Sequence, residues 1–503
     1  MISFIAKIVA YFRVKKIENT YSNAIKIQDT IFKKLIKSAS KTKFGIDHKF
    51  VNIISYDDFK KNVPIRDYES LKLYIKDVQD GKENILWPGK PKYFAKTSGT
   101  TSGIKLIPIT KESLPFHINS SRDAILFYIK QTGNSQFLNG KNIFIQGSPT
   151  LDEINGVLVG RLSGIVAHHI PKYLQGRNLP SMQANSIQDW ESKIDAICKE
   201  TINQDLRVVG GIPSWVQMYF ERLLKNKKNK KIIDLFKNLS LFVYGGVNFT
   251  PYKRIFSKLI GKKIDTLEYY PASEGFFAYQ NDQNDPSLLL QYNSEIFYEF
   301  IELDQFENRN RKRLNLSQVK LNKNYVMIVS SNAGLWAYNT GDTVMFKSII
   351  PPKIIVTGRH KHFISTFGEH VIAREVENSI NYAAKKTKLT VVEFTVAPMI
   401  SVTPKELPHH QWWVEFDSYD TRISEFAKII DAEMKKQNIY YKDLVDGKVL
   451  EPLKVIAVPA GSFKNYMKSL GKLGGQNKVP RLSNNREFVL GLNKYIKKIE
   501  SEN

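Results

Sequence analysis

Cysteine is almost absent from this sequence. Cys198 is the single cysteine among 503 residues, which excludes an internal disulfide framework. A lone thiol is typical of a protein kept in a reducing compartment, so we expect a cytoplasmic location. The paired histidines lack the additional cysteines, or the helical spacing around a glutamate, that a structural zinc site requires. We therefore expect no structural zinc.

Long hydrophobic runs are also missing. Spanning a bilayer takes about 20 apolar residues, and no stretch of the chain approaches that length, so we expect no transmembrane segment. The opening MISFIAKIVAYFRVKK is interrupted by Lys7 and is not followed by a small-residue cleavage site. Its apolar residues recur at helical spacing, namely Ile2, Ile5, Val9 and Phe12. This pattern predicts an amphipathic surface helix rather than a signal peptide.

Acidic residues are in short supply. The chain has 49 Asp and Glu against 74 Lys and Arg, a net charge of +25. Such an excess is typical of proteins that meet nucleic acid, an anionic membrane surface or anionic small substrates. The basic residues are scattered, and the one dense run, at 223–237, is typical of a solvated loop between helices. With no recognisable recognition module, we expect no nucleic-acid partner.

The length is greater than one hydrophobic core usually serves, which predicts at least two domains. Up to about residue 360, helical patterns alternate with short apolar runs such as LRVVGG and LSLFVYGG, and this alternation predicts an α/β core. Beyond it, apolar strands predict a smaller α+β domain, together with an amphipathic helix that has Phe426, Ile429, Ile430 and Met434 on one face. We predict a large domain over residues 1–358, a hinge at 359–363 and a small domain over 364–503.

The segment 93–110, YFAKTSGTTSGIKLIPIT, crowds hydroxyl groups and glycines beside Lys105. This composition predicts a loop that surrounds an anion, in the first place phosphate. The spacing is not that of a Walker loop, because only three residues separate Gly99 from Gly103. Pro108 opposes a following helix, so we expect a hairpin between two strands. Turn chemistry alone supports an ordinary turn equally well.

Four later polar residues suit a nucleotide and its metal. Glu274 is expected just after a strand, where it could help to hold Mg²⁺ against phosphates. Asp342 is expected in a turn between two strands, where it could accept hydrogen bonds from ribose hydroxyls. Arg359 follows a glycine at the change of composition, where a hinge is expected. Lys478 lies in a glycine-rich segment and could neutralise charge developing at phosphorus, although most such lysines are ordinary exposed side chains.

Four motifs occur in a fixed order: Thr-Ser-Gly-Thr-Thr-x-Gly, Tyr-x-x-Ser-Glu, Tyr-x-x-Gly-Asp and Gly-Arg. The set resembles the adenylate-forming superfamily that includes firefly luciferase and acyl-CoA ligases. Within it, the sequence is most similar to the acyl acid amido synthetases, plant enzymes that conjugate auxin or jasmonate to amino acids. The resemblance runs from about residue 20 to residue 482. It implies mixed β-sheets with flanking helices and a β-barrel-like subdomain in the large domain, and a mobile small domain.

The resemblance also implies a role for each matching residue. ATP phosphates would contact the hydroxyl loop, made of Thr97, Ser98, Gly99, Thr100, Thr101 and Lys105. Adenine and Mg²⁺ would lie near a second set, made of Gly245, Gly246, Val247, Tyr270, Ser273 and Glu274. Asp342 would take the ribose hydroxyls with Arg359 close by, and Lys478 would meet the carboxylate and the α-phosphate during adenylation. Two departures affect the phosphate side, since the loop is one residue shorter before Lys105, and Asn339 replaces the usual arginine.

The acid substrate calls for an apolar pocket. We expect its walls to be the helix at 111–130, with His117 and Ser121, and the segment GGIPSWVQM, with Ile212 and Trp215. Plain core packing of these residues is an equal alternative, because pockets are themselves mostly apolar.

The implied reaction joins a small carboxylic acid to an amine, most simply an amino acid, at the expense of ATP. A carboxylate and an amine only form a salt at neutral pH, whereas acyl-AMP carries a good leaving group. ATP and Mg²⁺ are the expected cofactors. Two alternatives stay open: an acyl-CoA ligase that shares the adenylation step, and a basic nucleic-acid-binding protein whose binding would depend steeply on salt.

Overall fold

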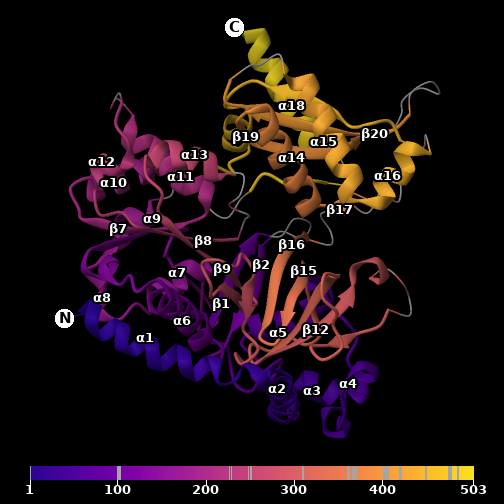
Figure 1. Ribbon diagram of the computed structural model, residues 1–503. Coiled ribbons are helices and arrows are strands. Elements are labelled where there is room, and N and C mark those ends of the chain that lie inside the picture. The colour runs from indigo at the N-terminus through magenta and orange to yellow at the C-terminus, as the bar shows by residue number, and fades with distance from the viewer. Residues whose placement is uncertain are drawn as a thin grey trace. The chain divides into compact units, whose positions relative to one another are not determined.

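The structure is a computed structural model of the whole chain (Figure 1). It describes residues 2–98, 104–187, 189–225, 227, 229–246, 249, 252–306, 308, 311–359, 363–364, 371–399, 407–418, 422–447, 450–473, 478–483 and 486–502. The chain divides into two compact units. The larger comprises Met1–Asn248, Ser257–Thr340 and Val344–Val356, and the smaller comprises Phe249–Phe256, Gly341–Thr343 and Thr357–Asn503.

The larger unit begins with a group of helices, α1 (Ile2–Glu18), α2 (Ala24–Ala39), α3 (Lys43–Asp47), α4 (Tyr56–Asn62) and α5 (Tyr68–Gln79), with 3-10 turns η1 (Tyr21–Asn23) and η2 (Phe50–Asn52). Side-chain caps start several of them. Ser55 and Asp58 form a capping box at α4, and Asp67 caps α5, which satisfies backbone amides that would otherwise lack partners. Among the described residues, none of the helices is both long and apolar enough to cross a membrane.

The predicted surface helix is confirmed as α1, but the side it buries differs from the one that its spacing suggested. Ala10, Val14 and Ile17 are buried, whereas the apolar residues singled out in the sequence are exposed, namely Ile2, Ile5, Val9 and Phe12. The helix is apolar around most of its circumference, so periodicity alone did not identify the inner side. The buried side belongs to the contact of α1 with the neighbouring helix α6 (Leu114–Thr132).

The hydroxyl-rich segment joins two strands, as predicted. Strands β1 (Tyr93–Ser98) and β2 (Ile104–Ile109) pair antiparallel, with Thr97 opposite Lys105. They belong to a four-stranded sheet of order β2-β1-β5-β4, completed by β4 (Asp152–Ile154) and β5 (Val157–Gly160). The connecting residues 99–103 lie outside the described part of the chain. The hairpin prediction is therefore confirmed for its strands.

The centre of the larger unit is a 12-stranded sheet of order β13-β12-β14-β15-β16-β11-β10-β9-β8-β7-β3-β6. One half is parallel and consists of β3 (Lys141–Ile145), β6 (Asn178–Leu179), β7 (Leu206–Gly211), β8 (Leu241–Gly245) and β9 (Asp265–Ala272). The intervening helical segments are η3 (Gln136–Asn139), α7 (Leu162–Ala167), α8 (Lys172–Gln175), α9 (Met182–Ser186), α10 (Trp190–Thr201), α11 (Pro213–Leu224), α12 (Ile232–Leu235) and α13 (Lys253–Ile260). The predicted α/β alternation is confirmed.

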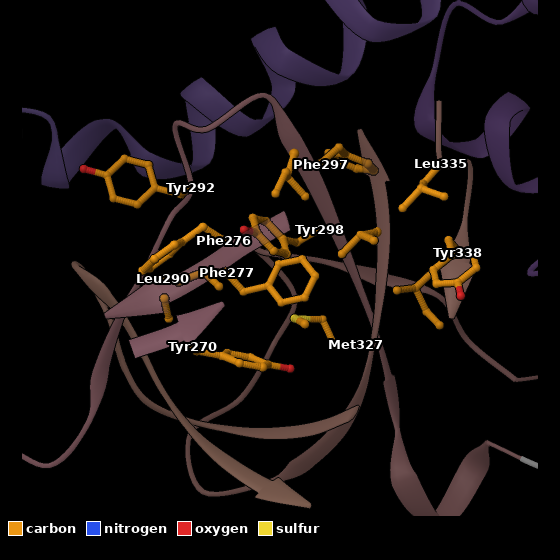
Figure 2. Packing of buried hydrophobic residues seen from close by; sticks show 14 of the residues in the cluster. Tyr270, Phe276, Phe277, Leu290, Tyr292, Phe297, Tyr298, Met327, Leu335 and Tyr338 are labelled. Carbon is orange, nitrogen blue, oxygen red and sulfur yellow. The ribbon is translucent and has the colours of Figure 1, made fainter. Parts of the chain in front are cut away.

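The other half of the sheet contains β10 (Gly275–Gln280), β11 (Leu288–Leu290), β12 (Ile296–Glu302), β13 (Leu314–Asn315), β14 (Asn324–Ser331), β15 (Tyr338–Ile349) and β16 (Pro352–Arg359), with the 3-10 turn η5 (Leu303–Gln305). Strand β11 pairs antiparallel with β10 and β16, and β12 pairs antiparallel with β13 and β14. Aromatic side chains fill the concave side, and Figure 2 shows the strands bending around Phe277, Tyr298 and Met327. Burial of such side chains is a main source of stability in a fold of this kind.

The smaller unit is α+β, as predicted. A three-stranded sheet of order β19-β20-β21 combines β19 (Val391–Met399), β20 (His409–Phe416) and β21 (Lys454–Val458). The remaining elements are β17 (Phe363–Ile364), β18 (Val371–Ile372), α14 (Ala373–Thr387), α15 (Ile423–Gln437), α16 (Ile439–Asp446), α17 (Ser462–Ser469) and α18 (Glu487–Glu502). Phe426, Ile430 and Met434 bury the predicted face of α15 in this unit's own core.

Candidate functional site

The first group of predicted site residues lies where the parallel strands end. Because β3, β7, β8 and β9 are parallel neighbours, their carboxyl ends share one edge of the sheet, the edge at which α/β sheets bind ligands. Ile145 pairs with Gly211 and Gly245 pairs with Tyr269 at this edge. Ile212 follows β7 directly and Gly246 follows β8. Segments far apart in the sequence therefore meet along one short line.

Glycines at this edge allow close approach of backbones. A Cβ atom on Gly245 would lie 2.6 Å from the Tyr269 carbonyl oxygen, and one on Gly211 would lie 2.8 Å from that of Ile145. Gly211 and Gly246 also have φ angles of +147° and +77°, which L side chains rarely adopt. Their backbone amides are thus not shielded by side chains of their own. Val247, the third residue of the predicted adenine loop, lies outside the described residues.

The turn between β9 and β10 holds three of the predicted residues. Ala272 pairs with Gly275, so Ser273 and Glu274 form the tip of the turn, and Glu274 follows a strand as predicted. Ser273 is buried and Glu274 is half-buried. The ring of Tyr270 packs against Phe277, with centroids 5.2 Å apart, and faces the aromatic core (Figure 2). Contact of Tyr270 with adenine stays a prediction.

Glu274 fits the demands of a magnesium site. Mg²⁺ in nucleotide enzymes is usually bound by one or two carboxylates together with water and substrate phosphates. A single half-buried carboxylate beside glycine-rich backbone provides such a ligand without a closed protein cage. Among the described residues there is no cluster of three or more His, Cys, Asp or Glu able to hold a metal by itself.

The hydroxyl loop is described only at its base. Thr97 is half-buried, and the ammonium group of Lys105 lies 5.6 Å from the centroid of the Tyr68 ring. A cation over an aromatic face is stabilised by the ring quadrupole, so Tyr68 orients this lysine. Ser98 ends β1, while Gly99, Thr100 and Thr101 lie outside the described residues. Their contact with phosphate stays a prediction.

Two predicted pocket residues share one face of α6. His117 and Ser121 are four residues apart, and the Tyr269 hydroxyl donates to the Ser121 carbonyl oxygen at 3.0 Å. His117 is buried, and its Nδ1 atom has no hydrogen-bond partner among the described residues. Burial lowers the pKa of His117 to about 4, so the imidazole is neutral at physiological pH. A neutral, unpartnered ring is suited to meet a ligand atom or an ordered water.

The other two predicted pocket residues belong to the start of α11. Ile212 is the N-cap residue of the helix. Trp215 is 3% exposed and packs against Trp190, with ring centroids 5.3 Å apart. This is the environment that core packing gives a tryptophan. A role for either residue in the acid pocket stays a prediction.

The second group of predicted residues lies in the smaller unit. The Arg359 Nε atom donates to Asp342 Oδ1 at 2.8 Å. Asp342 is buried and Arg359 is exposed. The expected turn at Asp342 is wrong: the residue lies within the long strand β15, which is hydrogen-bonded to both β14 and β16. The Gly-Asp pair favours a turn, but hydrogen bonding to the two neighbouring strands keeps this segment in the sheet. Gly341 has a φ of +82° inside the strand.

The charges of Asp342 and Arg359 also shift the pKa of Lys478. Desolvation and the charges of Arg359 and Arg481, opposed by that of Asp342, together lower the pKa of Lys478 to about 8. The residue itself remains exposed. Three predicted residues from separate segments of the chain are therefore near neighbours: Asp342, Arg359 and Lys478. An ammonium group with a lowered pKa beside a carboxylate and a guanidinium is typical of a functional site.

Sequence reasoning missed the residues that anchor the Lys478 segment. Arg481 forms ion pairs with Glu393 and Glu377 and donates to the Tyr252 hydroxyl at 3.1 Å. Next to it, the Thr395 hydroxyl donates to the Pro480 carbonyl oxygen at 2.6 Å. The segment is thus tied to β19 just after the lysine. An arginine among 74 basic residues gives no sequence signal of such a role.

A buried lysine at the edge of β3 was also missed. Lys193 Nζ donates to the carbonyl oxygens of Gln146, the residue after β3, and of Asn185, at 2.9 and 2.7 Å. Desolvation, and then the nearby Arg161, lower its pKa to about 8. Arg161 has no acidic partner within ion-pair distance among the described residues. Lys193 lies on α10, and nothing in its local sequence indicates that it points inward.

The predicted hinge is described only at its first and last positions, 359 and 363, since residues 360–362 lie outside the described part of the chain. Gly358, just before it, has a φ of +144°, and the Thr357 hydroxyl lies 2.9 Å from that of Thr343. Residues 341–343 and 357–358, which the sequence assigned to the large domain, group with the smaller unit. Movement at the hinge stays a prediction.

Comparison with known proteins gives a consistent result along the whole chain. The GH3 family N-terminal domain matches residues 13–264, the GH3 family central domain matches residues 289–359, and the GH3 family C-terminal domain matches residues 374–487. Among characterised relatives, the jasmonoyl-L-amino acid synthetase JAR4 of Nicotiana attenuata is 22% identical over 93% of this chain and 92% of its own length. The indole-3-acetic acid-amido synthetase GH3.15 of Arabidopsis thaliana is 32% identical over 28% of this chain and 24% of its own length.

The fold agrees with these matches. The solved structure of AtGH3.15 acyl acid amido synthetase in complex with 2,4-DB superposes with a TM-score of 0.78 at 17% identity, covering 97% of each chain. At this identity the likeness establishes the fold, a large domain of mixed sheets and helices with a smaller C-terminal domain. Since one domain match alone extends over half of the sequence, this chain belongs to the GH3 family.

Proposed function

We propose that this protein is an ATP-dependent acyl acid amido synthetase, which adenylates a carboxylic acid and then transfers the acyl group to the amino group of an amino acid. The observation that carries the proposal is the meeting of Asp342, Arg359 and Lys478 in the smaller unit. A hydrogen-bonded carboxylate suited to ribose and a nearby lysine suited to the α-phosphate are the groups that adenylation requires.

The larger unit carries its own set of residues suited to ATP. The glycine backbone at the ends of β7 and β8 would lie beside adenine, and Glu274 would hold Mg²⁺ against the phosphates. The hydroxyl hairpin would surround the phosphates themselves. When bound, Mg²⁺ shields phosphate charge and orients pyrophosphate as the leaving group.

Lys478 would act on the reacting atoms. Adenylation brings two anions together, because the substrate carboxylate attacks the α-phosphorus of ATP. A cation held beside both lowers their repulsion and stabilises the charge that builds up in the transition state. The lysine must be protonated for this purpose. The contacts of Arg481 hold the residues that follow it in place.

The substrate classes follow from the relatives rather than from the geometry. The relatives named above are a jasmonoyl-L-amino acid synthetase and an indole-3-acetic acid-amido synthetase. We propose an organic acid with an apolar body and an amino acid acceptor, and His117 as a neutral polar contact to the acid. Which acid is used depends on pocket residues, which vary freely within one fold.

The test is a screen for acid-dependent pyrophosphate release. The full-length protein, ATP and Mg²⁺ are mixed with a panel of carboxylic acids, each repeated with every amino acid and with coenzyme A. We expect pyrophosphate release with a subset of acids, followed by amide formation with particular amino acids. No acid-dependent release across the panel would contradict the proposal.

The same screen separates the alternatives. An acyl-CoA ligase would release pyrophosphate and form a thioester with coenzyme A but no amide. A nucleic-acid-binding protein would show salt-dependent binding that Asp342→Ala leaves unchanged. The relatives favour the amide-forming reaction over both.

A further inference from the structure

Helix α1 presents a continuous apolar face to solvent. Its exposed large residues are Ile2, Phe4, Ile5, Ile8, Val9, Tyr11 and Phe12. At about 100° per residue they cover about half of the helix circumference over the first three turns. Elsewhere in the described chain, exposed large apolar residues are scattered or occur in smaller groups. Contiguous apolar patches of this kind usually mark an interaction surface.

The opposite face of α1 is already occupied, which fixes the direction of the apolar face. Ala10, Val14 and Ile17 are buried on that side, where the helix packs on α6. The Arg13 guanidinium also donates two hydrogen bonds to the Asp123 carboxylate of α6, at 3.0 and 2.5 Å. Figure 1 shows α1 running along the margin of the larger unit beside α6. These contacts fix the orientation of α1, so its apolar face points away from the rest of the larger unit.

Positive charge surrounds the apolar face and continues it. Lys15 continues the same side in the last turn, and Lys7 and Lys16 lie beyond its two borders. From residue 2 to residue 17 the helix has no acidic residue; the first is Glu18, which pairs with Lys130. Aromatic and branched apolar side chains flanked by lysines are typical of helices that lie in the interface of an anionic bilayer.

We propose that this face of α1 docks the protein onto an anionic lipid surface. The helix would lie parallel to the membrane, with Phe4 and Phe12 entering the boundary between headgroups and acyl chains and the lysines contacting anionic headgroups. A second copy is the weaker candidate, because both chains would carry the same net charge of +25 and no acid is available on the face to pair with the lysines. The 17 residues of the helix lie on the surface and do not span the bilayer.

The test uses the full-length protein in vesicle flotation. Vesicles of phosphatidylcholine alone are compared with vesicles containing about 30% phosphatidylserine, enough to produce an appreciable negative surface potential. We expect binding to the mixed vesicles, weaker binding to phosphatidylcholine, and a decrease of affinity with added salt. Failure to bind the mixed vesicles would overturn the proposal.

Substitutions on exposed residues locate the effect. Phe4 and Phe12 are 69% and 66% exposed, so Phe4→Ser with Phe12→Ser removes apolar surface without disturbing the core; we expect affinity to fall about tenfold or more. The matched control is Val51→Ser with Ile54→Ser, at residues 79% and 84% exposed away from α1, which should bind like the wild type. Amide synthesis in solution should be unchanged in both. Equal binding by both variants would reject the site.

Charge is tested separately. Lys15→Glu with Lys16→Glu should abolish the preference for phosphatidylserine, whereas the same change of net charge in α2, Lys33→Glu with Lys37→Glu, should reduce it less. Sedimentation of the free protein addresses the other occupant. If the wild type forms a dimer that Phe4→Ser with Phe12→Ser converts to a monomer, the face belongs to a second copy and the lipid proposal is wrong.

Discussion

The two groups of candidate site residues are built in different ways. At the carboxyl edge of the parallel sheet, the larger unit offers backbone and glycine: Gly211 and Gly245 stand where a Cβ atom would meet a neighbouring carbonyl oxygen at less than 3 Å. In the smaller unit, the group consists of charges, with Asp342, Arg359 and Lys478 as neighbours. The first depends on shape and should tolerate no added atoms. The second depends on electrostatics and should respond to pH and charge.

The sharpest test of the charged group is Lys478→Ala. We expect acid-dependent pyrophosphate release to fall about 100- to 1000-fold, because the cation acts on charge that develops only in the transition state. Affinity for ATP should remain largely intact. Lys472→Ala, which removes another exposed lysine of the same segment, is the control. Normal turnover in the Lys478 variant would remove this residue from the mechanism.

The glycine edge is tested by Gly245→Ala. The added methyl group would lie 2.6 Å from the Tyr269 carbonyl oxygen and 3.1 Å from Pro271 Cδ, so the strands must separate. We expect a loss of about 1–3 kcal/mol of unfolding free energy and weaker ATP binding, measured by thermal unfolding and calorimetry. Gly176→Ala adds the same atom where nothing lies within 4 Å. If the two variants behave alike, the edge is not shape-limited.

Asp342→Ala removes the proposed ribose acceptor and leaves Arg359 without this partner. We expect ATP affinity to fall about tenfold, as for a lost hydrogen bond to a charged group, while the unfolding temperature changes little because Arg359 is exposed. Affinity for pyrophosphate, which has no ribose, serves as the control. A loss of equal size for ATP and pyrophosphate would argue for a general charge effect.

The charged group also predicts a pH dependence. The lowered pKa of Lys478, about 8, means that its protonated form declines as the pH rises through that value. We expect the adenylation rate to halve near pH 8 and to fall about tenfold one unit higher. Lys478→Arg keeps its charge at these pH values, so its remaining activity should be flat over the same range. If the adenylation rate of the wild type did not change over this pH range, the charged group would not depend on electrostatics as proposed.

Local patterns predicted the elements well and their surroundings less well. The hairpin at 93–109, the helix α15 and the apolar strands β7 and β8 are confirmed, because each is set by a pattern of residues over a short window. The turn at Asp342 and the inner side of α1 were wrong. In both cases the outcome depended on contacts with distant segments.

Residues with a distinctive local signal were found, and residues that act through distant partners were missed. Glu274 and Gly245 carry the turn and glycine signals that mark them in the sequence. In the sequence, Arg481 and Lys193 look like any other basic residue. Only the fold brings Glu393 to Arg481 and the Gln146 carbonyl oxygen to Lys193. Such partners are separated by many residues, and spacing carries no information about them.

By itself, the sequence determined the alternation of strands and helices, the ordered motifs and the excess of positive charge, because these are properties of neighbouring residues and of composition. Only the tertiary structure decided which strands lie side by side, which side of α1 faces solvent, and that Asp342, Arg359 and Lys478 meet. Those outcomes depend on packing between segments that are far apart in the sequence. Burial and Coulomb interaction act on distance in space, which the order of residues does not specify.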